Sequence, residues 1–309
     1  ESVFHFHSSR MVPILLILHL SLASCFIIRG HHVTYKEAPK WMVTYHLEDQ
    51  KLFNCAGTLI APQIVHTAAH CMRKASKDNK FLLTLRDYKA DIIEKTEVHR
   101  KGKDWFLRNK EHDEFNKQDD YGLIFLDKPV SVCEDENSLE VPIILDSSIF
   151  PNETSIMRPD EDDCYLMGWG VNEHGQYDHI LNKAQTKKMY IVRGSIVVMK
   201  YIDNARACNG DSGSPLICAV NKIPLLLGNV AGGIAIDKEA VDKAEEDWEK
   251  CDLRRDVYSF VTRQMPVLEE EIKKRNMWKE FVETQQRCAK LYMKRNGGKW
   301  VHENISSTQ

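Results

Sequence analysis

Nine cysteines, spread from Cys25 to Cys288, constrain this chain of 309 residues more than any other feature. A cytosolic chain of this size has no need of so many thiols unless they bind metal, and no two are spaced as Cys-x-x-Cys, a spacing typical of zinc sites. Scattered cysteines of this kind are typical of disulfide bridges formed in an oxidising compartment. The sequence therefore predicts a disulfide-bonded fold, with no metal ion and no cofactor.

The amino-terminal region indicates how the chain reaches such a compartment. Residues 12–28 are almost wholly apolar, and Ala23-Ser24-Cys25 offers small residues where a signal peptidase cuts. We expect residues 1–26 to be a leader and secretory signal peptide, which makes the protein secreted and extracellular. Removing Cys25 leaves 9 − 1 = 8 cysteines, an even number that suits four bridges. The alternative is an uncleaved membrane anchor, for which the stretch is short and interrupted by His19.

The charge balance excludes one broad class of function. The chain has 42 Lys and Arg against 45 Asp and Glu, which gives a net charge of −3. This near balance removes the electrostatic case for nucleic-acid binding. With 43% hydrophobic residues, 15 Gly and 10 Pro, the composition is that of a globular protein rather than a collagen-like or low-complexity chain. After signal removal we expect no membrane segment.

Beyond the leader, the apolar segments are short and bounded by turn residues, which predicts an all-β sandwich or barrel. The expected strands include residues 63–66, 81–85, 121–126, 165–167, 196–202, 216–220 and 225–230. Two stretches have helical spacing instead. Residues 237–250 are strongly charged, and residues 266–294 place apolar side chains on one face, which should pack on the body of the protein.

Three short motifs carry residue types used in nucleophilic catalysis. His70 ends Thr67-Ala68-Ala69-His70 and precedes Cys71, Asp120 opens an apolar strand, and Ser212 stands between glycines in Gly210-Asp211-Ser212-Gly213. Small neighbours of a serine let backbone N–H groups converge on an anion. Each motif alone is more often structural: a solvated histidine, a strand cap or a turn. In the chain order His, Asp, Ser, with a cysteine beside the histidine, the three motifs together are a specific indication of a catalytic site.

With these motifs the chain resembles the trypsin and chymotrypsin family of serine proteases over about residues 27–272. Further matching landmarks are Ile27-Ile28-Arg29-Gly30, Pro39, Gly168-Trp169-Gly170 and Val257-Tyr258. The resemblance implies an all-β fold of two packed six-stranded antiparallel β-barrels with the site in the cleft between them and a C-terminal helix. We assign residues 27–274 to the protease domain and residues 275–309 to a helical tail extension with a disordered end.

The resemblance also implies the roles of the site residues. Ser212 would attack the scissile carbonyl, His70 would take its proton, and Asp120 would fix the imidazole tautomer. The backbone N–H groups of Gly210 and Ser212 would form the oxyanion hole.

Three disulfides are implied by the family pairing, namely Cys55–Cys71, Cys164–Cys218 and Cys208–Cys251, while one bridge usual in the family has no counterpart. Cys133 and Cys288 then remain. We predict that they form a bridge that fastens the tail helix to the body, and the alternative is two unpaired thiols.

The specificity pocket departs from the family. Arg206 stands at its base, six residues before Ser212, and Asp256 replaces a glycine on its far wall. Either Arg206 recruits an acidic substrate side chain, or Arg206 and Asp256 pair and fill the pocket, which we favour because a buried guanidinium needs a partner. The family's substrate-aligning Ser-Trp-Gly reads Ala231-Gly232-Gly233. Loss of the indole removes an apolar platform, so binding of ordinary peptides should weaken.

Activation is also unusual in this sequence. In the family a cut frees an ammonium on the residue matching Ile27, and that ammonium inserts beside the residue matching Asp211. Here Phe26, which is not basic, precedes the cut, so either a further trimming step acts or the switch is never used.

Two functional hypotheses follow from these observations. The first is a secreted serine endopeptidase of unusual or narrow specificity, favoured because all three triad positions are present. The second is a secreted protease homologue that binds a partner with little turnover. The expected partners are a protein or peptide substrate and a macromolecular protease inhibitor, and we expect a monomer. Asn152-Glu153-Thr154 and Asn304-Ile305-Ser306 are acceptor sequences for N-glycosylation.

Overall fold

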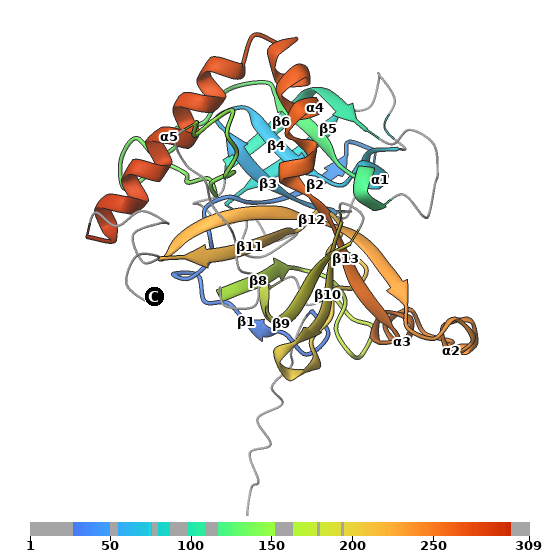
Figure 1. Ribbon diagram of the computed structural model, residues 1–309. Helices are drawn as coiled ribbons and strands as arrows, with labels where there is room; N and C mark the ends of the chain where they lie inside the picture. Colours follow the sequence, from blue (N-terminus) through green and yellow to red (C-terminus); the bar gives the residue numbers. More distant parts are fainter. Residues whose placement is uncertain are drawn as a thin grey trace, which may run out of the picture.

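Two six-stranded antiparallel β-barrels, packed against each other, make up most of the computed structural model (Figure 1). The model describes residues 27–49, 55–73, 75, 80–86, 98–108, 117–151, 163–177, 180–192 and 195–297. This all-β architecture is the one that the resemblance implied. The leader and signal assigned to residues 1–26 lie outside the described residues, as do the acceptor sites at Asn152 and Asn304 and the expected disordered end.

The first barrel closes in the strand order β2-β3-β4-β7-β6-β5. Its strands are β2 (Met42–Leu47), β3 (Cys55–Ala61), β4 (Ile64–Thr67), β5 (Phe81–Leu85), β6 (Val98–Leu107) and β7 (Gly122–Leu126). β5 alternates buried and half-buried residues, as a strand with one face on the core should. β3, β4 and β7 are buried along their whole length, because they are covered on both faces.

The second barrel is built from a sheet in the order β1-β9-β10-β13-β12-β11-β8, closed by pairing of β9 with β8. Its strands are β8 (Asp163–Gly168), β9 (Asn182–Val192), β10 (Ser195–Tyr201), β11 (Pro215–Val220), β12 (Ile223–Ala235) and β13 (Arg254–Phe260), with the short β1 (His31–His32) added at the edge. β12 and β13 pair over most of their length, so Gly233 lies opposite Asp256.

Short helices connect the strands, and the charged stretch 237–250 forms two of them rather than one. The short helices are α1 (Ala69–Met72), η1 (Lys117–Asp119), η2 (Ile202–Asn204), α2 (Lys238–Lys243) and α3 (Asp247–Asp252), and the last two come from the charged stretch. The break comes where Ala244 turns to extended backbone and Glu246 begins a capping box with Glu249. Both helices project from the second barrel beyond the ends of β12 and β13 (Figure 1).

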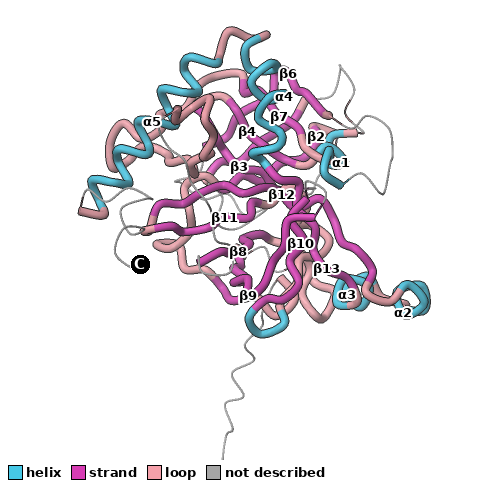
Figure 2. The backbone as a smooth tube through the Cα atoms, in the orientation of Figure 1, coloured by secondary structure: helices cyan, strands magenta, loops and turns pink. Residues whose placement is uncertain are grey.

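The second helical stretch, expected over residues 266–294, is also two helices, α4 (Val261–Lys273) and α5 (Trp278–Arg295). The expectation that helix begins at Pro266 was wrong, because α4 follows directly on β13 and holds Pro266 in its interior. From β13, α4 passes to the first barrel (Figure 2), where Oε1 of Gln264 lies 2.7 Å from Nε2 of the buried His66 on β4. The helix therefore joins the two barrels.

The tail helix α5 packs along the outside of the first barrel, as its apolar face predicted. Phe281, Cys288, Ala289 and Tyr292 are buried in the main core. The buried Gln285 accepts a hydrogen bond from the amide of Ile144 at 2.8 Å and donates one to the carbonyl of Ile60 at 2.9 Å. Because a buried amide without partners would be costly, these bonds fix the helix in one register.

Within the described ranges four disulfides are present, and they join the same pairs as those expected from the sequence: Cys55–Cys71, Cys133–Cys288, Cys164–Cys218 and Cys208–Cys251. Cys133–Cys288 ties α5 to the loop that follows β7. None of the helices in the described ranges combines the length and apolar character needed to span a bilayer.

The Cys133–Cys288 bridge should contribute measurably to stability. Replacing both residues by Ser removes a cross-link between positions 155 residues apart, so the free energy of unfolding should fall by about 2–4 kcal/mol. Denaturant unfolding of the oxidised wild type and the Cys133→Ser/Cys288→Ser variant measures this, with thermolysin cleavage within α5 as a second readout. Equal midpoints and equal cleavage would contradict the prediction.

Candidate active site

His70 is placed by a sharp turn at the end of the β3–β4 hairpin of the first barrel. β4 ends at Thr67, and His70 lies on the single turn of α1 that follows. The next residue, Cys71, is bridged to Cys55 at the beginning of β3, so the turn is covalently fastened to the adjacent strand. The imidazole remains accessible, with 31% of its side chain exposed.

Asp120, a buried residue between η1 and β7, holds the imidazole. Its carboxylate is 4% exposed and accepts two hydrogen bonds from His70, one from the backbone N–H at 2.8 Å and one from Nδ1 at 2.6 Å. Because an ionised carboxylate can only accept, Nδ1 carries the proton of the neutral ring and Nε2 is left with its lone pair. The backbone of Asp120 is held too, since Nδ2 of Asn229 donates to its carbonyl at 3.0 Å.

Ser212 belongs to the second barrel, yet its loop lies against the strands that carry His70. We call residues 205–214 the nucleophile loop. The carbonyl of Ser212 accepts a hydrogen bond from the amide of Ala56 on β3 at 2.9 Å. Gly213 has φ +80, and a Cβ there would overlap the carbonyl of Ala56 and Oγ1 of Thr67. Only glycine allows the loop to approach the first barrel this closely.

The serine and the imidazole are not hydrogen-bonded to each other among the described residues. Nε2 of His70 lies 3.6 Å from Sγ of Cys71 instead. Catalytic hydrogen bonds are often long without substrate and tighten when it binds. The structure thus brings His70 and Asp120 into direct contact and places the Ser212 backbone beside the same turn.

The two backbone N–H groups expected to form an oxyanion hole are not used in hydrogen bonds among the described residues. Gly210, at φ +96, and Ser212 make no hydrogen bond through their amides within the described part of the chain, whereas the amides of Asp211 and Ser214 are used inside the loop. Two unpaired donors at a half-buried serine can receive an anionic oxygen.

Asp211 is buried beneath the loop. Its carboxylate accepts hydrogen bonds from the amides of Gly170 at 2.8 Å and Cys208 at 3.0 Å. A Cβ on Gly168 or Gly170 would overlap this carboxylate, which explains the two glycines of the Gly-Trp-Gly motif. Burial raises the pKa of Asp211 to about 7, although the two backbone donors oppose the shift.

The segment of residues 27–30, called the start segment below, lies in the interior beside the nucleophile loop. Ile27 and Ile28 are fully buried. The amide of Arg206 donates to the carbonyl of Ile28 at 3.0 Å.

The direct pair between Arg206 and Asp256 that we favoured is not found among the described residues. Asp256 is 3% exposed, and its carboxylate accepts a hydrogen bond from the amide of Ala207 at 2.8 Å. Burial raises the pKa of Asp256 to about 6. The hydrogen bonds from Ala207 and Tyr201 and the nearby charge of Arg206 oppose this rise. Arg206 donates from Nη1 to the carbonyl of Ala205 at 2.7 Å. Donors from its own surroundings therefore replace the guanidinium as direct partners of Asp256.

Cationic side chains cover the glycines of the substrate-aligning strand. A Cβ on Gly232, where φ is +135, would lie 3.2 Å from Nζ and 3.4 Å from Cε of Lys117. A Cβ on Gly233 would lie 3.1 Å from Cδ of Arg254. Ala231 is buried and offers no polar side chain. Lys117 thus lies across the strand where the family's indole is absent.

Sequence reasoning missed Lys117, Arg254 and Arg29. Lys117 stands three residues before Asp120, but it is 115 positions from Gly232, so no local pattern relates the two. Arg29 was noted only as part of the Ile27-Ile28-Arg29-Gly30 motif. The opposite charges of Arg29 and Asp252 were the only sequence feature that could have indicated their contact.

A group of possible metal ligands at this site has the wrong chemistry. One ligand atom each from Cys55, His70 and Cys71 lies within 4.8 Å of the others. The two sulfurs form a disulfide, so no thiolate is free to bind a metal ion.

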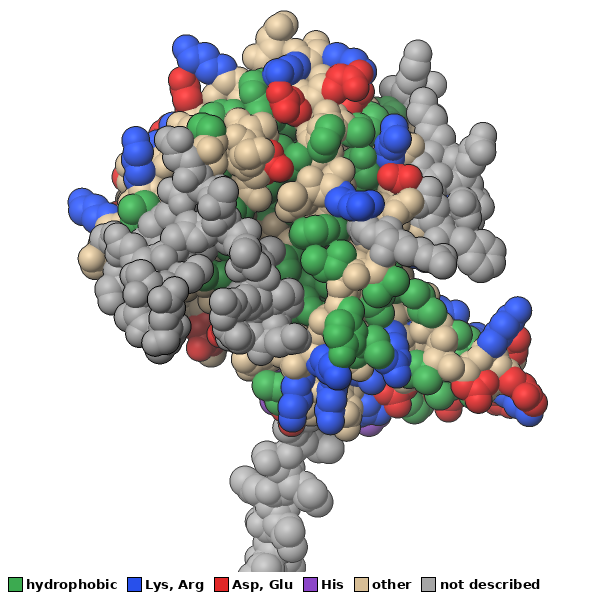
Figure 3. Space-filling model, in the orientation of Figure 1, with side chains coloured by type: hydrophobic (Ala, Val, Ile, Leu, Met, Phe, Trp, Pro, Cys, Tyr) green, Lys and Arg blue, Asp and Glu red, His purple; other side chains and the backbone are tan. Residues whose placement is uncertain are grey.

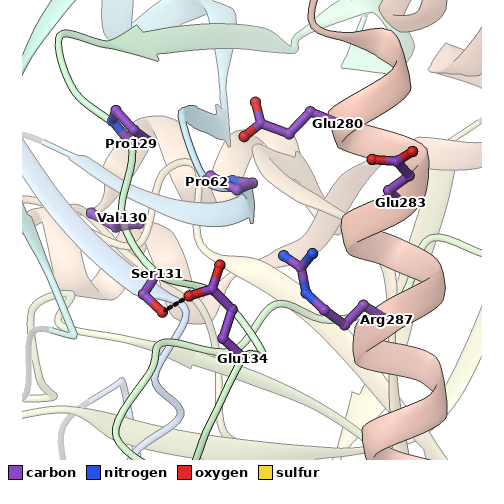
Figure 4. Close-up of a pocket in the computed structure, with 8 residues that line it drawn as sticks. All are labelled: Pro62, Pro129, Val130, Ser131, Glu134, Glu280, Glu283 and Arg287. Carbon is purple, nitrogen blue, oxygen red and sulfur yellow. Dashed lines mark hydrogen bonds between the residues drawn. The ribbon is translucent and has the colours of Figure 1, made fainter.

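A separate pocket of about 410 Å³ lies between α5 and the loop after β7 (Figure 4). Its lining residues are Pro62, Pro129, Val130, Ser131, Glu134, Glu280, Glu283 and Arg287. Arg287 donates from Nε and Nη2 to the carbonyl of Val132, and Glu134 accepts from the hydroxyl of Ser131. The two bonds from Arg287 fasten the tail helix to this loop, and the pocket shares no residue with the site at the junction of the barrels.

Two packed antiparallel barrels with this arrangement at their junction are the architecture of chymotrypsin-fold serine proteases. The family model described as Trypsin matches residues 27–243, and the chain belongs to this family.

Individual relatives agree with this assignment. The chain is 32% identical over 232 residues to the thrombin-like enzyme flavoxobin of Protobothrops flavoviridis, covering 68% of this chain and 80% of that protein. It is 30% identical over 229 residues to the snake venom serine protease KN2 of Trimeresurus stejnegeri, with the same two shares of 68% and 80%. The tissue-type plasminogen activator of Rattus norvegicus is 25% identical over 242 residues, which are 70% of this chain and 42% of that protein.

The raised pKa of Asp211 predicts how stability depends on pH while Ile27 remains joined to Phe26. The folded pKa of about 7 exceeds the ordinary value of 3.8, so the native state binds this proton more tightly than the unfolded chain does. Stability from Asp211 is present below about pH 4 and is lost as the pH rises to about 7. Relative to Asp211→Asn, the wild type should lose about 4 kcal/mol of unfolding free energy over this range.

Urea unfolding at pH 4, 5.5 and 7 measures the difference, with both proteins carrying Ser212→Ala to prevent self-cleavage. Parallel pH profiles for the two proteins would contradict the prediction.

Proposed function

We propose that the protein is a secreted serine endopeptidase in which Ser212, His70 and Asp120 act as one catalytic unit. The observation that supports this best is the pair of hydrogen bonds from His70 to the buried carboxylate of Asp120, at 2.6 and 2.8 Å. They leave Nε2 of His70 as a base beside the loop of Ser212. Relatives named as serine proteases and the apolar stretch before residue 27 support the activity and the secretion.

In this mechanism each group has one task. Nε2 of His70 takes the proton of the Ser212 hydroxyl as Oγ attacks the scissile carbonyl, and the imidazolium is stabilised by Asp120. The oxyanion accepts hydrogen bonds from the amides of Gly210 and Ser212, a contribution of about 3 kcal/mol per donor. His70 then protonates the leaving amine, and a water molecule, activated by the same imidazole, hydrolyses the acyl-enzyme.

Reaction with a fluorophosphonate tests the catalytic unit. The wild type should be labelled, Ser212→Ala should not, and Asp120→Asn should react about 10³–10⁴-fold more slowly because the ring loses its tautomer and orientation. Gel fluorescence measures the rates, and Ser148→Ala, a surface serine bonded to Asp146, serves as the matched control. Absence of labelling in the wild type, whether Ile27 is free or joined to Phe26, would reject the peptidase.

A second candidate function is a protease homologue that binds substrate-like partners with little turnover. Two observations favour it: the missing hydrogen bond between Ser212 and His70 within the described residues, and Ala231 and Gly232 in place of the family's Ser and Trp. In either function the protein is proposed to be monomeric and to bind protein substrates or a macromolecular inhibitor.

For the substrate, we propose acidic side chains near the scissile bond. Lys117 and Arg254 lie against Gly232 and Gly233 of the substrate-aligning strand. Arg206 is near enough to Asp256, opposite Gly233, for its charge to act on that carboxylate, which is already bound to Ala207. A carboxylate is the natural partner for such a group of cations.

Matched peptides measure this preference. With Glu and Gln compared at the second, third and fourth positions before the scissile bond, kcat/KM should favour Glu about threefold to fivefold at one position, as expected for a solvent-exposed ion pair. Lys117→Met should abolish the preference and Lys117→Arg should keep it. An unchanged preference in Lys117→Met would contradict the role given to Lys117.

A further inference from the structure

Arg29 fastens the start segment to three separate parts of the second barrel. Its guanidinium forms a two-pronged ion pair with Asp252, from Nη1 to Oδ1 at 2.8 Å and from Nη2 to Oδ2 at 2.9 Å. Nη1 also donates to the carbonyl of Asn204 at 3.0 Å, and the backbone N–H donates to Glu173 at 3.3 Å. Parallel Arg–carboxylate bonds combine strength with a fixed geometry, so the segment is held in one position.

The partner of Arg29 is connected covalently to the nucleophile loop. Asp252 is the last residue of α3 and follows Cys251, which is bridged to Cys208. Cys208 in turn donates its amide to the carboxylate of Asp211, the residue before Ser212. A short series of contacts therefore connects Arg29 to Asp211, the residue before the proposed nucleophile.

A second connection runs through the backbone. The carbonyl of Ile28 accepts the amide of Arg206, and Ile28 packs with Val171, Cys208 and Cys251 in a small buried cluster. The start segment thus contacts the beginning of the nucleophile loop directly, at Arg206 and Cys208.

The start segment needs such a fastening because its backbone is unfavourable. Ile27 has φ +52 and Arg29 has φ +56, in the left-handed region that L-residues, and β-branched ones above all, avoid. The angle φ of Ile27 exists only while residue 27 is joined to a preceding carbonyl. Attractive contacts must therefore keep the segment in place in the continuous chain.

In the continuous chain Asp211 lacks the ammonium partner that a cut before Ile27 would create. While Ile27 is joined to Phe26 its nitrogen is a neutral amide, which cannot give Asp211 an ammonium partner. The carboxylate instead accepts two backbone N–H groups, from Gly170 and Cys208, and forms no ion pair with any described cation. Its orientation is thus fixed by one backbone donor from the loop and one from Gly170 after β8.

We propose that Arg29 is a positioning residue: its ion pair with Asp252 keeps the start segment seated and the nucleophile loop ordered while Ile27 is still joined to Phe26. The site is then competent before any cut at that bond. This inference rests on the proposed peptidase activity and adds to it the means by which the site is ordered.

The test compares two forms of the protein, one beginning at Phe26 and one beginning at Ile27. Each is prepared as wild type, Arg29→Gln, Arg29→Lys and Arg295→Gln, and the rate of fluorophosphonate labelling is measured from pH 6 to pH 10. Arg295→Gln is the matched control, because Arg295 also pairs with a carboxylate, Glu140 at 2.9 Å, but lies on α5 against the first barrel.

We expect the Phe26 form of the wild type and of Arg295→Gln to react within about twofold of the Ile27 form, with no loss of rate up to pH 10. Arg29→Gln should react at least tenfold more slowly in the Phe26 form, and Arg29→Lys should recover part of the rate. In the Ile27 form of Arg29→Gln the new ammonium should restore labelling, which should then decline toward pH 10 as that group loses its proton. A purely structural role for Arg29 would not give this pH dependence.

Two outcomes would overturn the proposal while leaving the peptidase intact: a Phe26 form of the wild type that is silent while the Ile27 form reacts, or an Arg29→Gln variant that matches the wild type in the Phe26 form. If neither form reacts, the proposed function fails, and hydrogen exchange of Ser212→Ala decides the positioning role. The amides of Gly30 and Arg206 should then exchange at least tenfold faster with Arg29→Gln, and unchanged protection would overturn it.

Discussion

The buried carboxylate of Asp120 is the interaction on which the site depends. A carboxylate at 4% exposure must be given donors, and His70 supplies two of them, from its ring and from its backbone. Satisfying the charge therefore also fixes the imidazole. The bridge from Cys71 to Cys55 holds the same turn from the other side. Local stability and the orientation of a proton acceptor thus have one physical cause.

Close contact between the barrels supplies the rest of the site. The nucleophile loop reaches the first barrel through the carbonyl of Ser212 and the side-chain-free Gly213. Helix α4, running from β13 to His66 on β4, joins the barrels a second time. Helix α5 adds a bridged support outside the first barrel, remote from the site. A site divided between two barrels needs such fastenings, because each barrel alone holds only part of it.

Positive charge distinguishes the side of this site to which we assign the substrate. Lys117 and Arg254 lie against a strand in which Gly232 stands in place of an indole, and Arg206 is near Asp256 on the adjacent strand. Lys and Arg side chains also collect on the lower part of the second barrel, over β9 and β10 (Figure 3), where Lys188 lies directly opposite Lys200. The chain as a whole is slightly acidic, so this charge reflects local arrangement and not composition.

The sequence by itself determined the features that depend on local order, such as the short apolar strand β5 and the Gly-flanked turn at Ser212. Through the family motifs it also implied the two-barrel fold and three of the four cysteine pairs, which left Cys133 and Cys288 for the fourth. It misplaced the beginning of α4 and merged α4 with α5, since an apolar periodicity does not mark where neighbouring helices bend. It favoured a pair between Arg206 and Asp256, whereas Ala207 supplies the donor to that carboxylate. Only the tertiary structure could bring Lys117 over Gly232 and Arg29 onto Asp252, 223 residues away, because such contacts follow from how strands close into barrels and leave no trace in local spacing.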